Sequence, residues 1–189
     1  MSVNKIFIGL LNICSLYHKF GDILHLINSY SLKVFGLTET WLNCSIQNDE
    51  LFFDNFRTHR LDRVSNKGCG LCLLVHKCLN SIIENTLVTD NLELLHVSLD
   101  GMNSKSLQIV LVYRRHTSIP DFLHDLNYFL SNVDYVRVSM ILLGDFNSDP
   151  KTTDAAINLF LNLDTTGNAA FTNNNINGGI SGAALKIHR

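Results

Sequence analysis

The feature that most constrains the fold is an apolar run that ends in an acidic residue. Residues 138–143 are mostly apolar, as in a buried strand, and Gly144 then favours a sharp turn at the strand's end. Asp145 and Asn147 follow at the expected strand tip. Because burial of an isolated carboxylate is costly, Asp145 calls for a metal ion, a cationic group or a proton to accept. An Asx turn, in which Asp145 or Asn147 bonds its own backbone, explains the stretch equally well.

The same design recurs near the N-terminus. Residues 33–38 form a short apolar strand candidate, and its end delivers Glu39. Two buried strands that each present a carboxylate can converge on one metal ion, so the recurrence favours a shared metal site. Trp41, the only tryptophan, is predicted to anchor the loop that carries Glu39.

Five stretches of the chain together resemble a known superfamily. The two most specific are Leu-Thr-Glu-Thr-Trp-Leu at 37–42 and Leu-Gly-Asp-Phe-Asn at 143–147, and weaker matches lie in the same order at 11–16, 67–72 and 111–115. The combination resembles the endonuclease/exonuclease/phosphatase superfamily, and most of all the apurinic-type endonuclease domain of non-long-terminal-repeat retrotransposons.

The resemblance implies a DNase I-like fold, a two-sheet α/β sandwich with flanking helices, over residues 1–165. The hydrophobic patterns agree with it. They predict strands at 5–13, 33–38, 71–75, 81–88, 93–99, 106–113 and 138–143, a short strand within 52–63, and helices at 17–30, 118–133 and 152–163. Residues 166–189 hold a dense run of Asn, Gly, Thr and Ser, and are predicted to form a polar, irregular tail.

The resemblance also assigns roles to five residues. Glu39 and Asn12 would hold Mg²⁺ or Mn²⁺, and Asp145 would position or activate the attacking water. Asn147 and Tyr113 would donate hydrogen bonds to the phosphate. From the residues alone, Asn12 is equally well a turn former, and Tyr113 an aromatic residue at the rim of a sheet whose hydroxyl meets water.

One element that the resemblance implies is missing. Members carry, near the C-terminus, an Asp followed by a Ser-Asp-His triplet whose His contacts the scissile phosphate, and no Ser-Asp-His occurs in this sequence. Loss of such a His typically lowers the rate by a factor of about 10²–10⁴. We therefore expect a domain that is incomplete on its C-terminal side and lacks the last strands.

Three functions are consistent with these residues. The first is a divalent-metal-dependent DNA endonuclease of retrotransposon type, weakened by the missing triplet, with a reverse transcriptase domain as its partner in the ancestral polyprotein. The second is an inactive remnant that binds a metal or a partner. The third is a phosphatase of the same superfamily, since the metal site does not choose among phosphate esters.

Charge restricts how such a protein could bind DNA. The formal net charge is −2, which gives no global attraction to a polyanion, so binding must use local basic clusters. Two clusters occur, Arg57, Arg60, Arg63 and Lys67, and further on Arg114, Arg115 and His116. The structural alternative for both is a solvated loop surface.

The cysteine count and the hydropathy indicate the cellular environment of the protein. The five cysteines are an odd number spread over core-like segments, which favours reduced thiols and an intracellular location, nuclear if the chain acts within a retrotransposon. Cys69 and Cys72 form a C-x-x-C without a second pair, so they are predicted to be core residues rather than zinc ligands. No apolar stretch approaches the length of about 20 residues that crosses a bilayer, so no membrane partner is expected.

Overall fold

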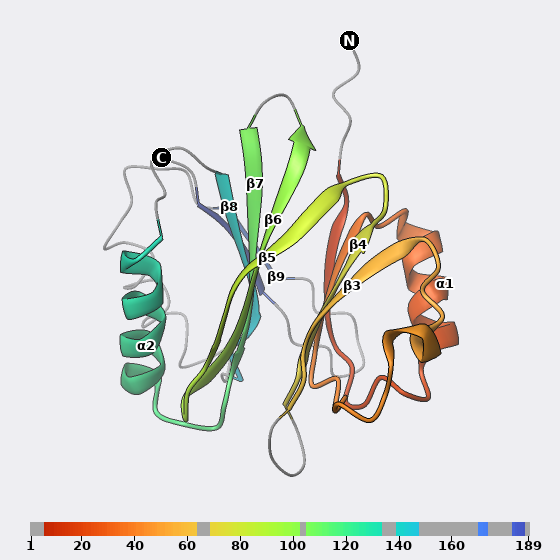
Figure 1. The fold of residues 1–189 in the computed structure, drawn as a ribbon. Helices are drawn as coiled ribbons and strands as arrows, with labels where there is room; N and C mark the ends of the chain where they lie inside the picture. Colours follow the sequence, from red (N-terminus) through yellow and green to blue (C-terminus); the bar gives the residue numbers. More distant parts are fainter. Residues whose placement is uncertain are drawn as a thin grey trace.

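Two β-sheets lie between two helices in the computed structural model (Figure 1). It describes residues 6–63, 69–102, 105–133, 139–147, 170–173 and 183–187. The smaller sheet has the order β1-β2-β4-β3 and the larger one β5-β6-β7-β8-β10-β9. The strands are β1 (Ile8–Asn12), β2 (Val34–Thr38), β3 (Phe56–Leu61), β4 (Leu71–His76), β5 (Asn80–Val88), β6 (Leu92–Met102), β7 (Lys105–Arg114), β8 (Ser139–Asp145), β9 (Ala170–Asn173) and β10 (Ala183–Ile187).

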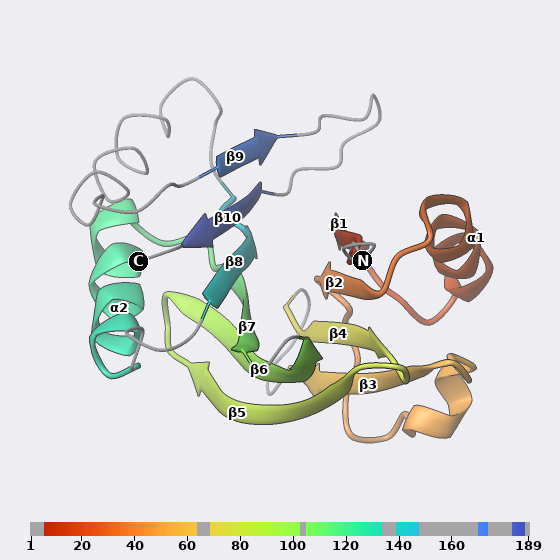
Figure 2. The ribbon, with the colours of Figure 1, turned by 90° about the horizontal axis from the view of Figure 1, so that it is seen from above.

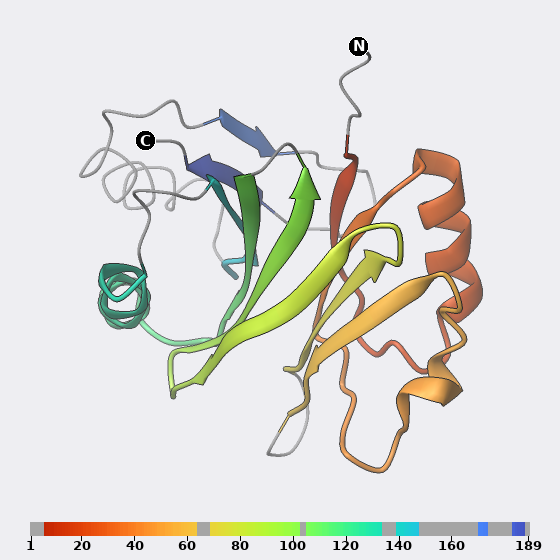
Figure 3. The same cartoon turned by 45° about the horizontal axis from the view of Figure 1, so that its top comes forward.

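Three apolar layers hold these elements together. The central layer joins the facing sides of the two sheets, with Val34 and Leu73 from one and Leu95, Leu111 and Leu143 from the other. An outer layer packs α1 (Phe20–Tyr30) on the smaller sheet, and another packs α2 (Ile119–Ser131) on the larger one. The order is therefore helix, sheet, sheet, helix, as Figure 3 shows. The predicted two-sheet α/β sandwich with flanking helices is confirmed.

The predicted start of α2 is also confirmed. Ser118 is its N-cap, and the Ser118 hydroxyl accepts a hydrogen bond of 3.3 Å from the Asp121 amide. Pro120 lies in the first turn, where its fixed φ suits a helix and no intrahelical donor is lost. The segment between β2 and β3 contains a short 3₁₀ helix, η1 (Asn48–Leu51).

Two parallel strand pairs bring four strand ends to one edge of the sandwich. β1 pairs in parallel with β2, so that Asn12 lies opposite Thr38. β7 pairs in parallel with β8, so that Tyr113 lies opposite Asp145. Since parallel neighbours end on the same side of a sheet, the residues that leave these strands meet at a common rim.

Gly144 differs from its prediction. It was expected to end the strand, but β8 continues through Asp145. A Cβ atom built on Gly144 would lie 2.9 Å from the Val112 carbonyl oxygen and 2.9 Å from Phe146 Cζ. The glycine therefore permits close approach of neighbouring groups, not a turn.

The C-terminal stretch differs as well. Residues 166–189 were predicted to be irregular, yet β10 pairs with β8 and β9 pairs with β10 (Figure 2). Strand pairing uses backbone groups, so a polar composition does not prevent it where a strand edge is available. The predicted helix at 152–163 lies outside the described residues. Among the helices that are described, none has the length and apolar character needed to span a membrane.

Candidate active site

Polar side chains close one end of the central apolar layer. Each of these residues lies two positions after a residue that faces the central layer on the same strand. Because side chains in a strand alternate between its two faces, each of them also faces the opposite sheet. Thr38 follows Gly36, Tyr113 follows Leu111, and Asp145 follows Leu143. Asn12, opposite Thr38 on β1, shares that face. The alternation of the core therefore delivers a hydroxyl, a phenol, a carboxylate and an amide to one place.

Asn12 connects the two carboxylates predicted to meet. Its amide nitrogen donates a hydrogen bond of 2.8 Å to Glu39 Oε1 and another of 2.6 Å to Asp145 Oδ2. The amide oxygen accepts bonds of 3.2 Å from the Cys14 amide and of 3.2 Å from Cys14 Sγ. The predicted convergence of Glu39 and Asp145 is thus a feature of the fold.

This arrangement fits a hard divalent cation. The partial positive charge of the Asn12 amide group lies between two carboxylates, where a cation would neutralise both. Mg²⁺ needs only one or two carboxylates because it retains several waters. The Thr38 hydroxyl oxygen is buried on the same face and has no hydrogen-bond partner among the described residues, so it could bond to such a water. Within the described residues there is no group of three His, Cys, Asp or Glu side chains that could together hold a metal ion.

The backbone that carries Glu39 adopts an unusual conformation. Glu39 and Trp41 have φ values of 52° and 56°, in the left-handed region that non-glycine residues occupy at a cost of about 1–2 kcal/mol each. Backbone bonds hold the loop in place, from Ser15 N–H to Glu39 O at 2.9 Å and from Trp41 N–H to Cys69 O at 3.1 Å. The Trp41 side chain is 37% exposed and these backbone bonds hold the loop, so the anchoring role expected of the Trp41 side chain stays a prediction.

Tyr113 joins the cluster from β7. It is buried, and its hydroxyl donates a hydrogen bond of 3.2 Å to Glu39 Oε1. Burial raises the Tyr113 pKa above its ordinary value, with a smaller rise from the charge of Glu39 and a partial offset from a side-chain hydrogen bond with Asn147. The phenol therefore remains protonated and can donate at neutral pH.

Asn147 lies beside Asp145 and Tyr113. Its backbone amide donates a bond of 3.0 Å to Asp145 Oδ1, which is the Asx-type turn predicted as the structural alternative. Its side-chain nitrogen donates a bond of 2.6 Å to the Arg114 carbonyl oxygen. The Asx turn is therefore confirmed, and the other carboxylate oxygen faces Asn12, while the metal-binding or proton-accepting role of Asp145 stays a prediction.

Arg114 and Arg115 are not the solvated basic surface expected of them. Arg114 is buried and donates to the carbonyl oxygens of Phe146, Asn147 and Thr117. Burial lowers its pKa, and the charge of Asp145 partly offsets this. Its guanidinium ties the end of β7 to the segment after β8, and thereby holds Asp145 beside Tyr113.

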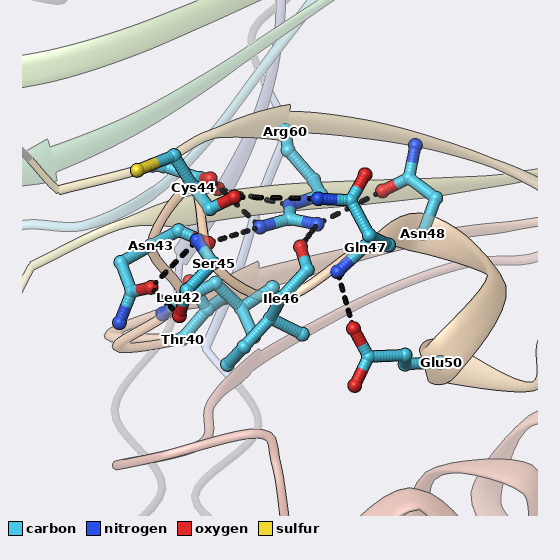
Figure 4. Close-up of polar contacts among 11 residues, drawn as sticks. Thr40, Leu42, Asn43, Cys44, Ser45, Ile46, Gln47, Asn48, Glu50 and Arg60 are labelled. Carbon is cyan, nitrogen blue, oxygen red and sulfur yellow. Dashed lines mark hydrogen bonds and ion pairs between the residues drawn. The ribbon is translucent and has the colours of Figure 1, made fainter.

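Arg60, from the other basic cluster, is likewise used inside the protein (Figure 4). Its guanidinium donates to the carbonyl oxygens of Asn43 and Ile46 at 3.1 and 2.8 Å, and pairs with Asp62 at 2.7 Å. Arg57 donates to the Leu79 carbonyl oxygen. Arg60 therefore organises the loop that follows Glu39, whereas Arg57 contacts the backbone just before β5.

Two residues near the site were not singled out from the sequence. Cys14 Sγ lies 3.6 Å from Glu39 Oε2, and burial together with the charge of Glu39 raises the pKa of this thiol. Glu93 is buried on β6 and forms an ion pair of 2.9 Å with Arg115. The alternation of β6 could have revealed Glu93, because it places this charge on the same face as Leu95.

Cys69 and Cys72 follow their prediction in part. Cys72 is fully buried in the smaller sheet, and burial raises its pKa to about 12. Cys69 precedes β4, is half-buried, and has a φ of 70°. All five cysteines are free thiols.

Comparisons with known proteins cover most of the chain. A model of the endonuclease/exonuclease/phosphatase family matches residues 9–181. The search of curated proteins finds no match.

Several solved structures share the fold. The endonuclease domain of TRAS1, a telomere-specific non-LTR retrotransposon, has a TM-score of 0.60 at 10% identity, and the match covers 95% of this chain and 98% of that one. TDP2 of D. rerio, complexed with single strand DNA product, has a TM-score of 0.65 at 12% identity, with coverages of 98% and 84%. A mannosyl-6-phosphatase of Bacteroides thetaiotaomicron has a TM-score of 0.63 at 10% identity, with coverages of 97% and 85%. At these identities the likeness is evidence of the fold alone.

Proposed function

The chain belongs to the endonuclease/exonuclease/phosphatase family, and on this premise we propose that it is a divalent-metal-dependent phosphodiesterase that cleaves DNA. The observation that carries the proposal is the Asn12 amide nitrogen, which bonds to Glu39 and Asp145 together. Two carboxylates held around one positive group at a rim form a site for a hard cation and a phosphate. The TRAS1 endonuclease domain and the DNA-complexed TDP2 support DNA as the substrate.

Each of the site residues would have its own role in the proposed reaction. Glu39 would hold Mg²⁺ or Mn²⁺ through a carboxylate oxygen and Asn12 would do so through its amide oxygen, and the ion supplies positive charge against the phosphate when bound. Asp145 would orient a water and accept its proton, because Asn147 and Asn12 fix its two carboxylate oxygens. The Tyr113 hydroxyl, protonated and aimed at Glu39, would donate to a phosphate oxygen.

Asn147 has a more limited part than the resemblance implies. One N–H of its side-chain amide is directed at the Arg114 carbonyl oxygen. An amide nitrogen carries two hydrogens, and since the side chain also bonds with Tyr113, a phosphate contact would take the place of that second bond. Asn147 would then hold Asp145 and touch the substrate at the same time.

A phosphatase is the second candidate, supported by the mannosyl-6-phosphatase among the structures with this fold. The same carboxylates and phenol would serve a phosphate monoester. A metal-binding module without catalysis is the third, because the sequence holds no Ser-Asp-His triplet.

A plasmid-nicking assay with Mg²⁺ or Mn²⁺ tests the proposal, with release of phosphate from sugar monophosphates measured in parallel. Glu39→Gln and Asp145→Asn should each lower nicking by about 10²-fold or more. Asp54→Asn is the matched control, since Asp54 is exposed. Nicking by wild type that both variants retain would overturn the assignment. Phosphate release without nicking would support the phosphatase, and Mn²⁺ binding without either activity would support the metal-binding module.

A further inference from the structure

Glu93 is a buried acid that the proposed chemistry does not use. We propose that it is a positioning residue, which holds the loop of Glu39 in the conformation that presents this carboxylate to the cation. The inference rests on the proposed function for its catalytic meaning. The contacts that carry it are backbone and side-chain hydrogen bonds of the described residues.

Glu93 uses both carboxylate oxygens on groups beyond its own strand pair. Oε2 accepts a hydrogen bond of 2.7 Å from the Gly70 amide, and Oε1 accepts one of 2.9 Å from Arg115 Nη2. Arg115 supplies the positive charge that a buried carboxylate requires. Glu93 therefore fixes the corner formed by Cys69 and Gly70, just before β4.

The same corner holds the Glu39 loop. The Gly70 carbonyl oxygen accepts from Thr40 N–H at 3.1 Å, and the Cys69 carbonyl oxygen accepts from Trp41 N–H at 3.1 Å. These amides belong to the two residues directly after Glu39. A single chain of bonds thus runs from the Glu93 carboxylate through Gly70 to the backbone that carries Glu39.

The opposite side of the loop is held independently. The amides of Ser15 and Leu16 donate to the carbonyl oxygens of Glu39 and Thr40, each at 2.9 Å. The loop is therefore clamped between the segment after β1 and the Cys69–Gly70 corner. Release of one side leaves the left-handed conformations of Glu39 and Trp41 held only from the other.

The corner tolerates little change. Cys69 and Gly70 have φ values of 70° and 93°, and a Cβ atom on Gly70 would lie 2.7 Å from Thr40 Oγ1. The Gly70 amide is buried, so without the Glu93 carboxylate it would have to find another acceptor or remain unpaired. A carboxylate in this place does what an apolar residue of similar size could not, because it accepts from two donors at once.

The test compares the full-length wild type with Glu93→Gln, using Glu84→Gln as the matched control. Glu84 lies on the same sheet, is exposed, and accepts a bond from Ser98. Two quantities are measured, the Mn²⁺ affinity from the free ion in electron paramagnetic resonance, and the anisotropy decay of Trp41, the only tryptophan. Glu93→Gln should weaken Mn²⁺ binding about tenfold or more, lower kcat with little change in KM for DNA, and speed the anisotropy decay. Glu84→Gln should change none of these.

Other outcomes are decisive as well. Wild-type Mn²⁺ affinity and Trp41 anisotropy in folded Glu93→Gln would overturn the inference, whatever the melting temperature. If Glu93→Gln does not fold, Glu93→Asp decides in its place, because it keeps the charge beside Arg115 and shortens the reach to Gly70. A wild type that neither binds Mn²⁺ nor cleaves DNA would overturn the proposed function alone, and the Trp41 anisotropy would still decide the role of Glu93.

Discussion

Asn12 and Asp145 are 133 residues apart in the chain, yet the Asn12 amide nitrogen lies 2.6 Å from Asp145 Oδ2. The same nitrogen bonds to Glu39. Without a bound cation this amide offsets part of the repulsion between the two carboxylates, since like charges at close range disfavour the folded state. The stability of the protein should therefore respond to both the amide and the cation.

Asn12→Asp would replace the shared donor by a third carboxylate. We expect a lower melting temperature without a divalent cation, and a larger rise on addition of Mn²⁺ than in wild type, because a ligand that binds the folded state more tightly stabilises it more. Differential scanning fluorimetry with and without Mn²⁺ measures both. Asn28→Asp, at an exposed position in α1, should behave as wild type. Equal Mn²⁺ shifts in Asn12→Asp and Asn28→Asp would contradict the metal site.

Gly144→Ala should destabilise the protein by about 1–3 kcal/mol. The added methyl group would meet the Val112 carbonyl oxygen and the Phe146 ring, each at 2.9 Å, so β8 would have to move away from β7. Gly21→Ala is the control, since a Cβ atom there has no neighbour within 4 Å. In α1 this change should stabilise by about 0.5–1 kcal/mol. Urea denaturation of both variants is the measurement, and a loss in Gly21→Ala equal to that in Gly144→Ala would refute the steric argument.

Arg60→Lys should lower the free energy of unfolding by about 1.5–3 kcal/mol. A lysine cannot reproduce the planar set of donors that reaches the Asn43 and Ile46 carbonyl oxygens together with Asp62. Arg63→Lys should be close to neutral, because Arg63 contacts the loop through its backbone amide, which bonds to Leu42 O. Chemical denaturation followed by circular dichroism compares the two, and equal effects would be inconsistent with the role of Arg60.

The raised pKa of Cys72 leads us to expect a loss of stability at alkaline pH. Burial raises its pKa from 9.0 to about 12, so the folded state keeps the thiol protonated over a range in which the unfolded chain releases the proton. The contribution of Cys72 is complete below pH 9 and is lost as the pH rises toward about 12, with a slope of about 1.36 kcal/mol per pH unit. Cys72→Ala should remove that slope, and Cys44→Ala, at an exposed position, should retain it. Unfolding free energies between pH 8 and about 11 give the answer, and parallel curves for wild type and Cys72→Ala would contradict it.

Local patterns predicted much of the fold. Hydrophobic patterns located β1 to β8 but not β9 and β10, and Ser118 with Pro120 located the start of α2. The local patterns failed where one residue type has two possible structural roles. Gly144 resembles a turn residue but provides room beside Val112. The boundary predicted after residue 165, and the catalytic roles of the site residues, stay predictions.

The sequence by itself determined the family, the two strand ends that carry Glu39 and Asp145, and the prediction that they meet. The family follows from the resemblance of five ordered stretches, whereas the strand ends and their expected meeting follow from short-range periodicity and from the high cost of burying a lone carboxylate. Only the tertiary structure decided which partners the polar groups take: that the Asn12 amide lies between the carboxylates, that Arg60 and Arg114 bond to loop carbonyls, and that Glu93 holds Gly70. A hydrogen bond depends on distances of a few tenths of an ångström between segments far apart in the chain, and such distances exist only once the sheets have packed.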